Sequence, residues 1–167
     1  MSHARTKAAA GLQALEPLVG KWHTEGQQFE GPLGPAAPFV AVETFEWLDG
    51  GQFLVHRLDG HFGRQPAACV EVLGKRAEGE LFAQTFYNDG NRNDWVVKAD
   101  GRVLSWTGTW PQGSPKPLHV RYTVSFEDAG NTLVGRWEQS GDGQTWHSFL
   151  EARSTKAQPL PDSSIGT

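Results

Sequence analysis

The chain has 167 residues, of which 38% are hydrophobic and 20% charged, a balance typical of one globular domain and not of a disordered chain. Its formal net charge of -4 argues against a nucleic-acid-binding domain, which would normally present a basic face. Cys69 is the only cysteine, which excludes an intramolecular disulfide and a CxxC metal or redox site.

The N-terminal region predicts a short helix from Thr6 to Val19. Apolar residues recur at helical spacing from Leu12 onward, Thr6 can cap the helix, and Gly20 ends it. Pro17 indicates that the last turn is irregular. A helix this short needs a surface to pack on, so we expect it to lie across one end of the fold or along its flank.

After Gly20 the apolar residues alternate with a period of two, which indicates about ten β-strands. Asp-Gly pairs between them are typical of hairpins, because glycine accepts the positive φ that such turns require. The expected strands are 21–29, 39–48, 52–59, 67–73, 80–88, 94–98, 102–110, 118–127, 131–139 and 144–153. Closing this antiparallel meander into a barrel would remove its exposed edges, so the predicted fold class is an all-β barrel with a short N-terminal helix.

We expect a single barrel domain over residues 6–155, with a disordered N-terminus at 1–5 and a flexible, polar tail at 156–167. The first residues lack the apolar core of a signal peptide, and no run approaches a transmembrane length. There is also no basic amphipathic stretch for a membrane surface. These features predict a cytoplasmic protein with no membrane or nucleic-acid partner.

The start of the first strand carries a resemblance to a known superfamily. A helix, then Gly20-x-Trp22, then a long antiparallel meander resembles the calycin superfamily of lipocalin-like β-barrels. In that superfamily the tryptophan plugs the closed end of the barrel, and an arginine near the end of the last strand packs over its ring. Trp22 matches the first position, and Arg153 is the candidate for the second.

Four further segments resemble an uncharacterised bacterial family of lipocalin-like domains. They are EWLDGGQFLVHRLDG, EVLG, TFYNDGN and WEQSGDGQTW, and the resemblance covers roughly residues 12–155. Barrels of about ten strands can enclose a cavity, and such cavities usually combine apolar walls with a few polar anchors.

Three residues are candidates for catalysis if the protein is an enzyme: His56, Glu43 and Glu46. His56 shares a strand face with Leu54 and Leu58, and an inward histidine could be a general base, a metal ligand or a ligand anchor. An inward carboxylate against tryptophan would have a raised pKa, which suits proton transfer.

Each of these candidates has a structural alternative. His56 could be a hydrogen-bonded interior histidine or an outward one. Glu43, Glu46 and the similar Glu71 could instead pair with an arginine on a neighbouring strand.

Arg121 shares one strand face with His119 and Thr123, while Tyr122 belongs to the other face. An interior Arg121 would resemble the guanidinium clamp that holds the acid group in fatty-acid-binding barrels. If Tyr122 and its neighbours face inward, Arg121 is a charged residue on the surface. Periodicity leaves both interpretations open.

Aromatic side chains would line any cavity, and some could form flat walls for a planar or ring-bearing ligand; for most of them the alternative is core packing. The candidate lining residues are Phe45, Trp47, Phe86, Trp95, Trp106, Trp110, Trp137 and Trp146.

The sequence predicts no metal site and no cofactor. No two histidines show HxH or HxxxH spacing, and TFYNDGNRND lacks the ligand order of a calcium loop. The related nitrobindin-like barrels bind haem through a histidine, but the C-terminal motif that carries it is not found here, and haem binding stays open.

Three functions fit these features. The first is binding of a small, partly apolar, aromatic or ring-bearing molecule in the barrel. The second is an isomerase, cyclase or hydrolase that uses the cavity for proton transfer, so whether the protein is an enzyme stays open. The third is an interaction protein, for which an apolar outer face would allow a homodimer.

Overall fold

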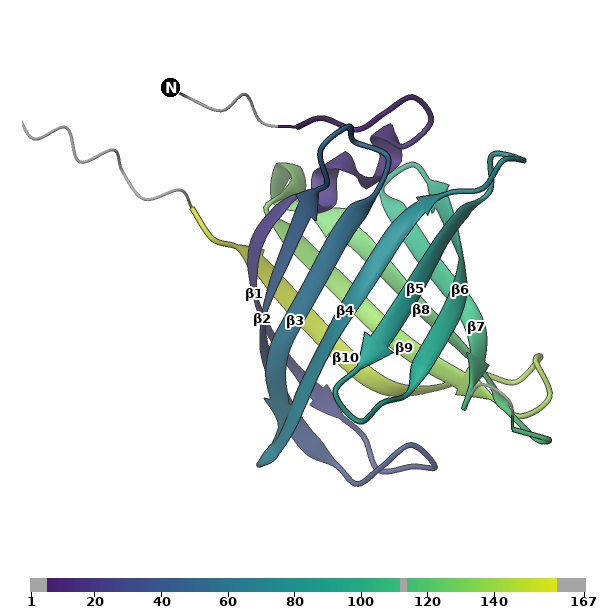
Figure 1. The fold of residues 1–167 in the computed structure, drawn as a ribbon. Coiled ribbons are helices and arrows are strands. Elements are labelled where there is room, and N and C mark those ends of the chain that lie inside the picture. Colours follow the sequence, from purple (N-terminus) through teal and green to yellow (C-terminus); the bar gives the residue numbers. More distant parts are fainter. Residues whose placement is uncertain (1–5, 112–113, 159–167) are drawn as a thin grey trace, which may run out of the picture.

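The computed structural model describes residues 6–111 and 114–158, which form one closed antiparallel barrel (Figure 1). Each strand pairs with its neighbours in the chain, and β1 closes the barrel against β10. The strands are β1 (Gly20–Gln28), β2 (Ala37–Trp47), β3 (Leu54–Phe62), β4 (Gln65–Lys75), β5 (Leu81–Tyr87), β6 (Arg92–Asp100), β7 (Val103–Trp110), β8 (Leu118–Glu127), β9 (Thr132–Ser140) and β10 (His147–Lys156). The predicted all-β, ten-stranded barrel is therefore confirmed.

Strand β10 begins and ends three residues later than the expected 144–153, and β3 and β4 run past the expected limits at 59 and 67 to meet at a tight turn. The expected end of the third strand lay just before Gly60, but Gly60 is inside β3 and pairs with Ala41. A Cβ at Gly60 would lie 2.2 Å from the carbonyl oxygen of Val40. This glycine therefore allows close approach of two strands and does not make a turn.

The N-terminal helix is shorter than expected. Only a 3-10 helix, η1 (Gln13–Leu18), forms, and the residues from Thr6 to Leu12 contain no helix. Gly11 has a positive φ of 82°, which ends any helical run before η1. Thr6 does not cap a helix, since its hydroxyl donates to Asp49 at 3.4 Å. A second short 3-10 turn, η2 (Asp128–Gly130), precedes β9.

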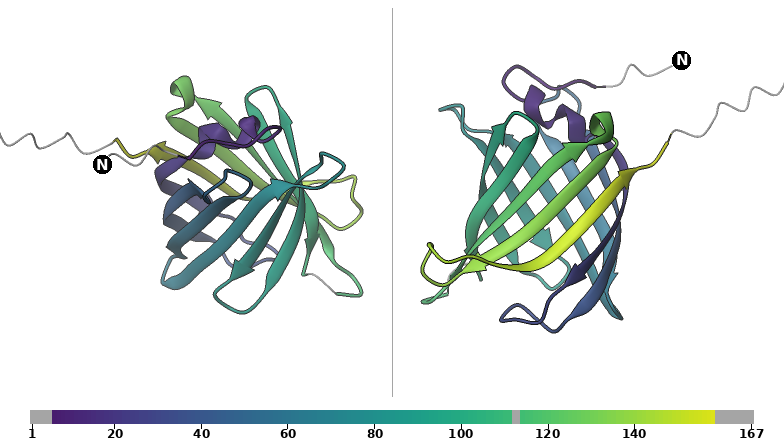
Figure 2. Two further views of the ribbon diagram at one scale, coloured as in Figure 1. Left: turned by 45° about the horizontal axis from the view of Figure 1, so that its top comes forward. Right: turned by 180° about the vertical axis from the view of Figure 1, so that it is seen from behind.

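The helix η1 lies across one end of the barrel, as Figures 1 and 2 show. Its leucines enter the main core, where Leu15 is fully buried. Beneath them Trp22 is also fully buried and donates its indole N–H to the Leu18 carbonyl at 2.7 Å. This end of the barrel is therefore plugged, as expected for Trp22.

The cation over Trp22 is Lys156 and not Arg153, so that prediction is wrong. The Lys156 ammonium lies 4.7 Å from the centre of the indole. Ser154 faces inward toward Thr24, so alternation turns Arg153 outward, where it pairs with Glu127 at 3.3 Å.

The segments expected on either side of the domain lie partly outside the residues that the structure describes. Lys156 still belongs to β10, whereas the predicted disordered N-terminus at 1–5 and most of the predicted tail, 159–167, lie outside the described residues. Among the residues that are described, no helix has the length and apolar character needed to cross a bilayer.

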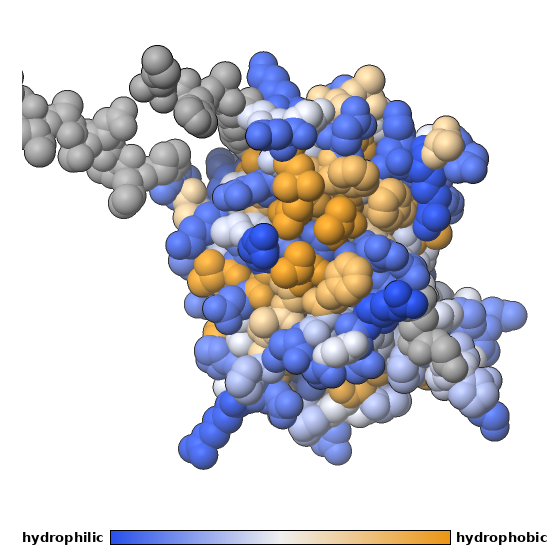
Figure 3. All heavy atoms as spheres, viewed as in Figure 1, coloured by the Kyte–Doolittle hydropathy of each residue, from blue (hydrophilic) through white to orange (hydrophobic). Residues whose placement is uncertain are grey.

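The face of the molecule seen in Figure 3 is mainly polar but carries an apolar patch. The large hydrophobic side chains that remain exposed are Phe29, Val40, Val42, Leu48, Phe53, Phe86 and Val103. Phe86 is therefore an outer-face residue, and its predicted position in the cavity is wrong.

Candidate ligand-binding site

The barrel encloses a partly open cavity of about 690 Å³. It extends from Leu18 and Trp22 at the plugged end to the loops at the other end, where Pro35 and Asn88 line it. Small-molecule sites typically have volumes of about 300–1,000 Å³. Its aromatic lining residues are Trp22, Phe39, Phe45, Phe62, Tyr87, Trp95, Trp106, Trp110, Tyr122, Trp137 and Phe149.

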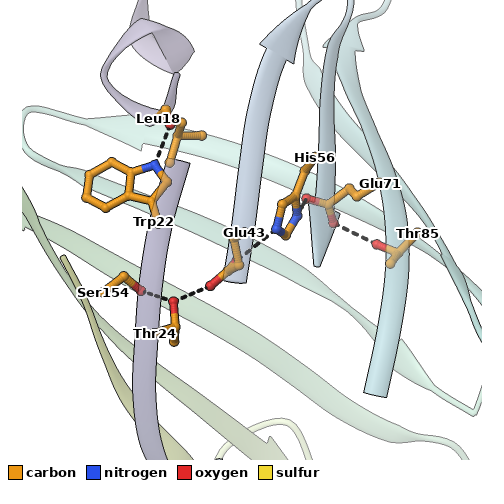
Figure 4. A network of polar contacts seen from close by, with 8 residues as sticks. All are labelled: Leu18, Trp22, Thr24, Glu43, His56, Glu71, Thr85 and Ser154. Carbon is orange, nitrogen blue, oxygen red and sulfur yellow. Dashed lines mark hydrogen bonds and ion pairs between the residues drawn. The ribbon is translucent and has the colours of Figure 1, made fainter. Parts of the chain in front are cut away.

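A histidine flanked by two carboxylates lies on one wall of this cavity (Figure 4). His56 Nε2 lies 2.8 Å from Glu43 Oε2, and His56 Nδ1 lies 3.6 Å from Glu71 Oε1. The residues come from the adjacent strands β3, β2 and β4, and alternation turns each of them inward. Phe45 stacks flat on the imidazole, with ring centroids 4.0 Å apart.

Hydroxyl groups hold both carboxylates in place. Thr24 donates to Glu43 Oε1 at 2.5 Å and lies 2.7 Å from the Ser154 hydroxyl. Thr85 donates to Glu71 Oε2 at 2.6 Å and accepts the indole N–H of Trp95 at 3.0 Å. The acid groups are thus held by their neighbours and do not need solvent to orient them.

The histidine is the positive member of this cluster. Burial alone would lower its pKa, but the hydrogen bond and charge of Glu43, together with Glu71, raise the pKa of His56 to about 9. Burial opposes ionisation of Glu43, yet the His56 contact outweighs it and lowers the pKa of that carboxyl. At neutral pH the site therefore contains an imidazolium, which can donate a proton but cannot accept one.

A row of inward polar residues runs across four adjacent strands, beginning at His56. His56, Glu71, Thr85 and Asn93 are successive cross-strand partners on β3, β4, β5 and β6. Asn93 is 1% exposed, and neither atom of its amide has a hydrogen-bond partner among the described residues. The same holds for His56 Nδ1 and the Trp106 indole N–H. Buried polar groups are seldom left without partners, so His56 and Trp106, which line the cavity, retain donor capacity for a bound molecule, whereas Asn93 does not line it.

Aromatic rings form the opposite wall. Tyr122 stacks on Trp137 with centroids 4.5 Å apart, and Trp95 meets Trp137 edge to face at 5.7 Å. Trp106 lies against Tyr122 at 5.3 Å. These contacts build a continuous aromatic surface from β6 to β9 that a flat ring system can pack against.

Several residues predicted from the sequence lie together in this cavity. His56 and Glu43 are in contact, and Phe45, Trp95, Trp106, Trp110 and Trp137 line the same space. Trp47 is buried but does not line the cavity: it packs in the plugged end, where its indole N–H donates to Glu16 at 2.8 Å.

Four further predicted residues lie outside the cavity: Glu46, Phe86, Arg121 and Trp146. Glu46 is exposed because it alternates with the inward Phe45 and Trp47, and Phe86 is exposed because its neighbour Thr85 faces inward. Arg121 is on the outer face, where it forms two hydrogen bonds to Glu138 and lies 4.2 Å from the ring of Trp146. The predicted placement of these residues in the cavity is wrong, and the surface alternative for Arg121 is correct.

Sequence reasoning missed the other polar members of the wall. Periodicity alone does not bring Glu71 together with His56, and it gives no signal that Thr24, Thr85 or Asn93 lies near this cluster. Counting the register outward from each hairpin would have aligned Glu71 with His56, since they are direct partners. The alternative pairing of these acids with an arginine on a neighbouring strand is not found among the described residues, where Arg136, for example, pairs with Glu151.

No group of three or more His, Cys, Asp or Glu side chains within residues 6–111 and 114–158 is arranged to hold a metal ion. The two ring nitrogens of His56 point to different carboxylates, so the three groups do not converge on a common point.

The fold and cavity define a small, single-barrel protein with an internal cavity. The chain belongs to the DUF1579 family, whose description is "Protein of unknown function". The family model matches residues 8–156. No curated protein matches the sequence.

Solved structures that share the fold include the following two. The crystal structure of Rv2717c from M. tuberculosis aligns with a TM-score of 0.66 and 18% identity, over 91% of this chain and 100% of that chain. The S-type phycobiliprotein lyase CPES from Guillardia theta aligns with a TM-score of 0.53 and 10% identity, over 87% of this chain and 92% of that chain. At these identities the likeness concerns the fold.

Proposed function

We propose that this protein binds a small, partly apolar, ring-bearing molecule in the barrel cavity. The observation that carries the proposal is the cavity itself: about 690 Å³, with aromatic rings on one wall and the Glu43–His56–Glu71 cluster on the other. A planar molecule would pack on the rings, and its polar atoms would meet the acid and amide groups. That a fold neighbour is a phycobiliprotein lyase supports a ring-bearing ligand.

We also infer that the barrel belongs to the calycin superfamily. Support comes from the ten-stranded closed barrel, the Trp22 plug under a short helix, and a cation over the Trp22 ring, although the cation is Lys156.

Binding can be tested by titrating the neutral dye N-phenyl-1-naphthylamine and following its fluorescence. Leu58 lines the cavity, so Leu58→Trp fills space there and should weaken dye binding about ten-fold or more. Arg57→Trp is the matched control, since Arg57 is exposed on the same strand and should leave binding unchanged. Equal dye affinity in the two variants would contradict binding inside the barrel.

One observation favours a second function, proton-transfer catalysis. His56 is buried, protonated at neutral pH and held against Glu43, an arrangement that suits a general acid. The two functions predict different small molecules bound to the purified wild-type and His56→Gln proteins. An enzyme should yield a different small molecule from wild type and from His56→Gln, because only wild type converts its substrate. A binding protein should yield the same molecule from both, in different amounts.

A further inference from the structure

We propose that the cavity selects a cationic ligand: a ring-bearing organic amine whose ammonium group sits at Glu43 and Glu71 and whose rings pack on the aromatic wall. This inference rests on the proposed binding function and specifies the chemical class of the ligand.

The first support is the charge of the lining. Among the described residues that line the cavity, Glu43, Glu71 and Asp89 carry carboxyl groups, His56 is the one basic side chain, and none is lysine or arginine. Within the buried cluster, one imidazolium against two carboxylates leaves a net charge of -1. The side chains of Glu43 and Glu71 are only 14% and 10% exposed, so solvent screens this charge poorly. A cation would neutralise it, and an anion would add to it.

The second support is unused acceptor capacity. Glu43 accepts from both Thr24 and His56, whereas the one short hydrogen bond to Glu71 from the described residues comes from Thr85, at Oε2. Its Oε1 lies 3.6 Å from His56 Nδ1, beyond hydrogen-bonding distance. A carboxylate oxygen has two acceptor sites, so Glu71 Oε1 is available to the N–H groups of an ammonium ion.

The third support comes from the opposite wall. In the closed strand order, β8 lies as far around the barrel from β3 as the fold allows, so Tyr122 on β8 faces the acidic wall across the cavity. Burial, followed by the charges of Glu43 and Glu71, raises the pKa of the Tyr122 phenol. The acids and the aromatic rings therefore face one another across the same cavity. Ring faces next to carboxylates are a known environment for organic cations.

A matched series of ligands on one scaffold tests the inference by isothermal titration calorimetry at pH 7. The probes are 1-naphthylmethylamine, which is positive at this pH, 1-naphthalenemethanol, which is neutral, and 1-naphthaleneacetate, the anion of 1-naphthaleneacetic acid, which is negative. We expect the amine to bind at least about ten-fold more tightly than the alcohol, and the acetate at least about ten-fold more weakly. If none of the three binds, the proposed function fails. If the alcohol binds as tightly as the amine, only the inference about charge is overturned.

Substitutions of the two buried glutamates test whether these residues cause the preference for the amine. Glu71→Gln removes the net charge of the cluster but keeps the shape of the side chain, so the advantage of the amine over the alcohol should fall about ten-fold while alcohol binding stays within about three-fold. Glu43→Gln should act in the same direction and serves as the second variant if Glu71→Gln does not fold. Glu46→Gln is the control, because Glu46 is on β2 but exposed to solvent. An unchanged amine preference in a folded Glu71→Gln or Glu43→Gln protein would overturn the assignment.

Discussion

At the scale of single residues, the decisive feature is one imidazole shared by two buried carboxylates. Any one of these three charges alone would be costly to bury, but together they stabilise one another. The Thr24 and Thr85 hydroxyls occupy further acceptor sites, which holds the acids in one geometry. The cluster therefore combines a structural role with a polar wall facing the cavity.

The raised pKa of His56 predicts a pH dependence of stability. The ordinary value is 6.5 and the folded value is about 9, so the folded state binds the proton more tightly than the unfolded state. Its contribution to the free energy of unfolding, up to about 3 kcal/mol, should be complete below pH 6.5 and should be lost as the pH rises through 9. Glu43 acts in the opposite direction, losing its contribution as the pH falls below its ordinary range.

Urea unfolding between pH 6 and 10 measures this directly, with His56→Gln as the reference. We expect the wild-type free energy of unfolding to fall across this range, and the variant to lack that fall. Parallel pH profiles for the two proteins would show that His56 does not bind its proton more tightly when folded.

Sequence periodicity predicts the direction of some of these side chains and not of others, for a physical reason. The leucines on either side of His56 mark one face of its strand as apolar, so its inward position follows. Arg121 lies in a strand whose two faces both contain residues that can be buried, so alternation alone leaves its direction open. Glu46 and Phe86 point outward because the residues next to them in the strand point inward. Which residues of a strand point inward depends on its register with the neighbouring strands, which periodicity does not give.

At the scale of elements, η1 closes one end of the barrel. The sequence signals for it were the buried leucines, which do pack into the core, but the expected length was wrong. A positive φ at Gly11 and a proline inside η1 leave only six helical residues. So short a helix has little stability of its own and must derive it from packing on the barrel.

Shortening one leucine should reveal how much this packing contributes. Leu15 is fully buried in the core cluster, so Leu15→Ala should lower the free energy of unfolding by about 2–4 kcal/mol through lost burial and a cavity. Gln13→Ala, at an exposed position in the same helix, should change it by less than about 1 kcal/mol. Urea unfolding of both variants measures the difference, and a loss below about 1 kcal/mol for Leu15→Ala would mean that η1 does not stabilise the barrel.

At the scale of the whole molecule, ten strands close a barrel wide enough to leave a cavity that side chains do not fill. The alternating pattern and the Asp-Gly hairpins were sufficient to predict the strands and their order. They could not predict the cavity chemistry, because the contact between Glu43, His56 and Glu71 depends on the register of three strands. A tryptophan-rich composition likewise does not distinguish Trp47 in the plugged end from Trp137 in the cavity wall.

The central claim is that the cavity holds a small ring-bearing molecule, and the mass of the freshly purified protein tests it most directly. Native and denaturing mass spectra should be compared for wild type and for Leu58→Trp. We predict an additional mass on native wild-type protein that disappears on denaturation, absorbs ultraviolet light as a ring system does, and is reduced in the variant with the filled cavity. An additional mass that is equally abundant on Leu58→Trp, or a released molecule without rings, would contradict the claim.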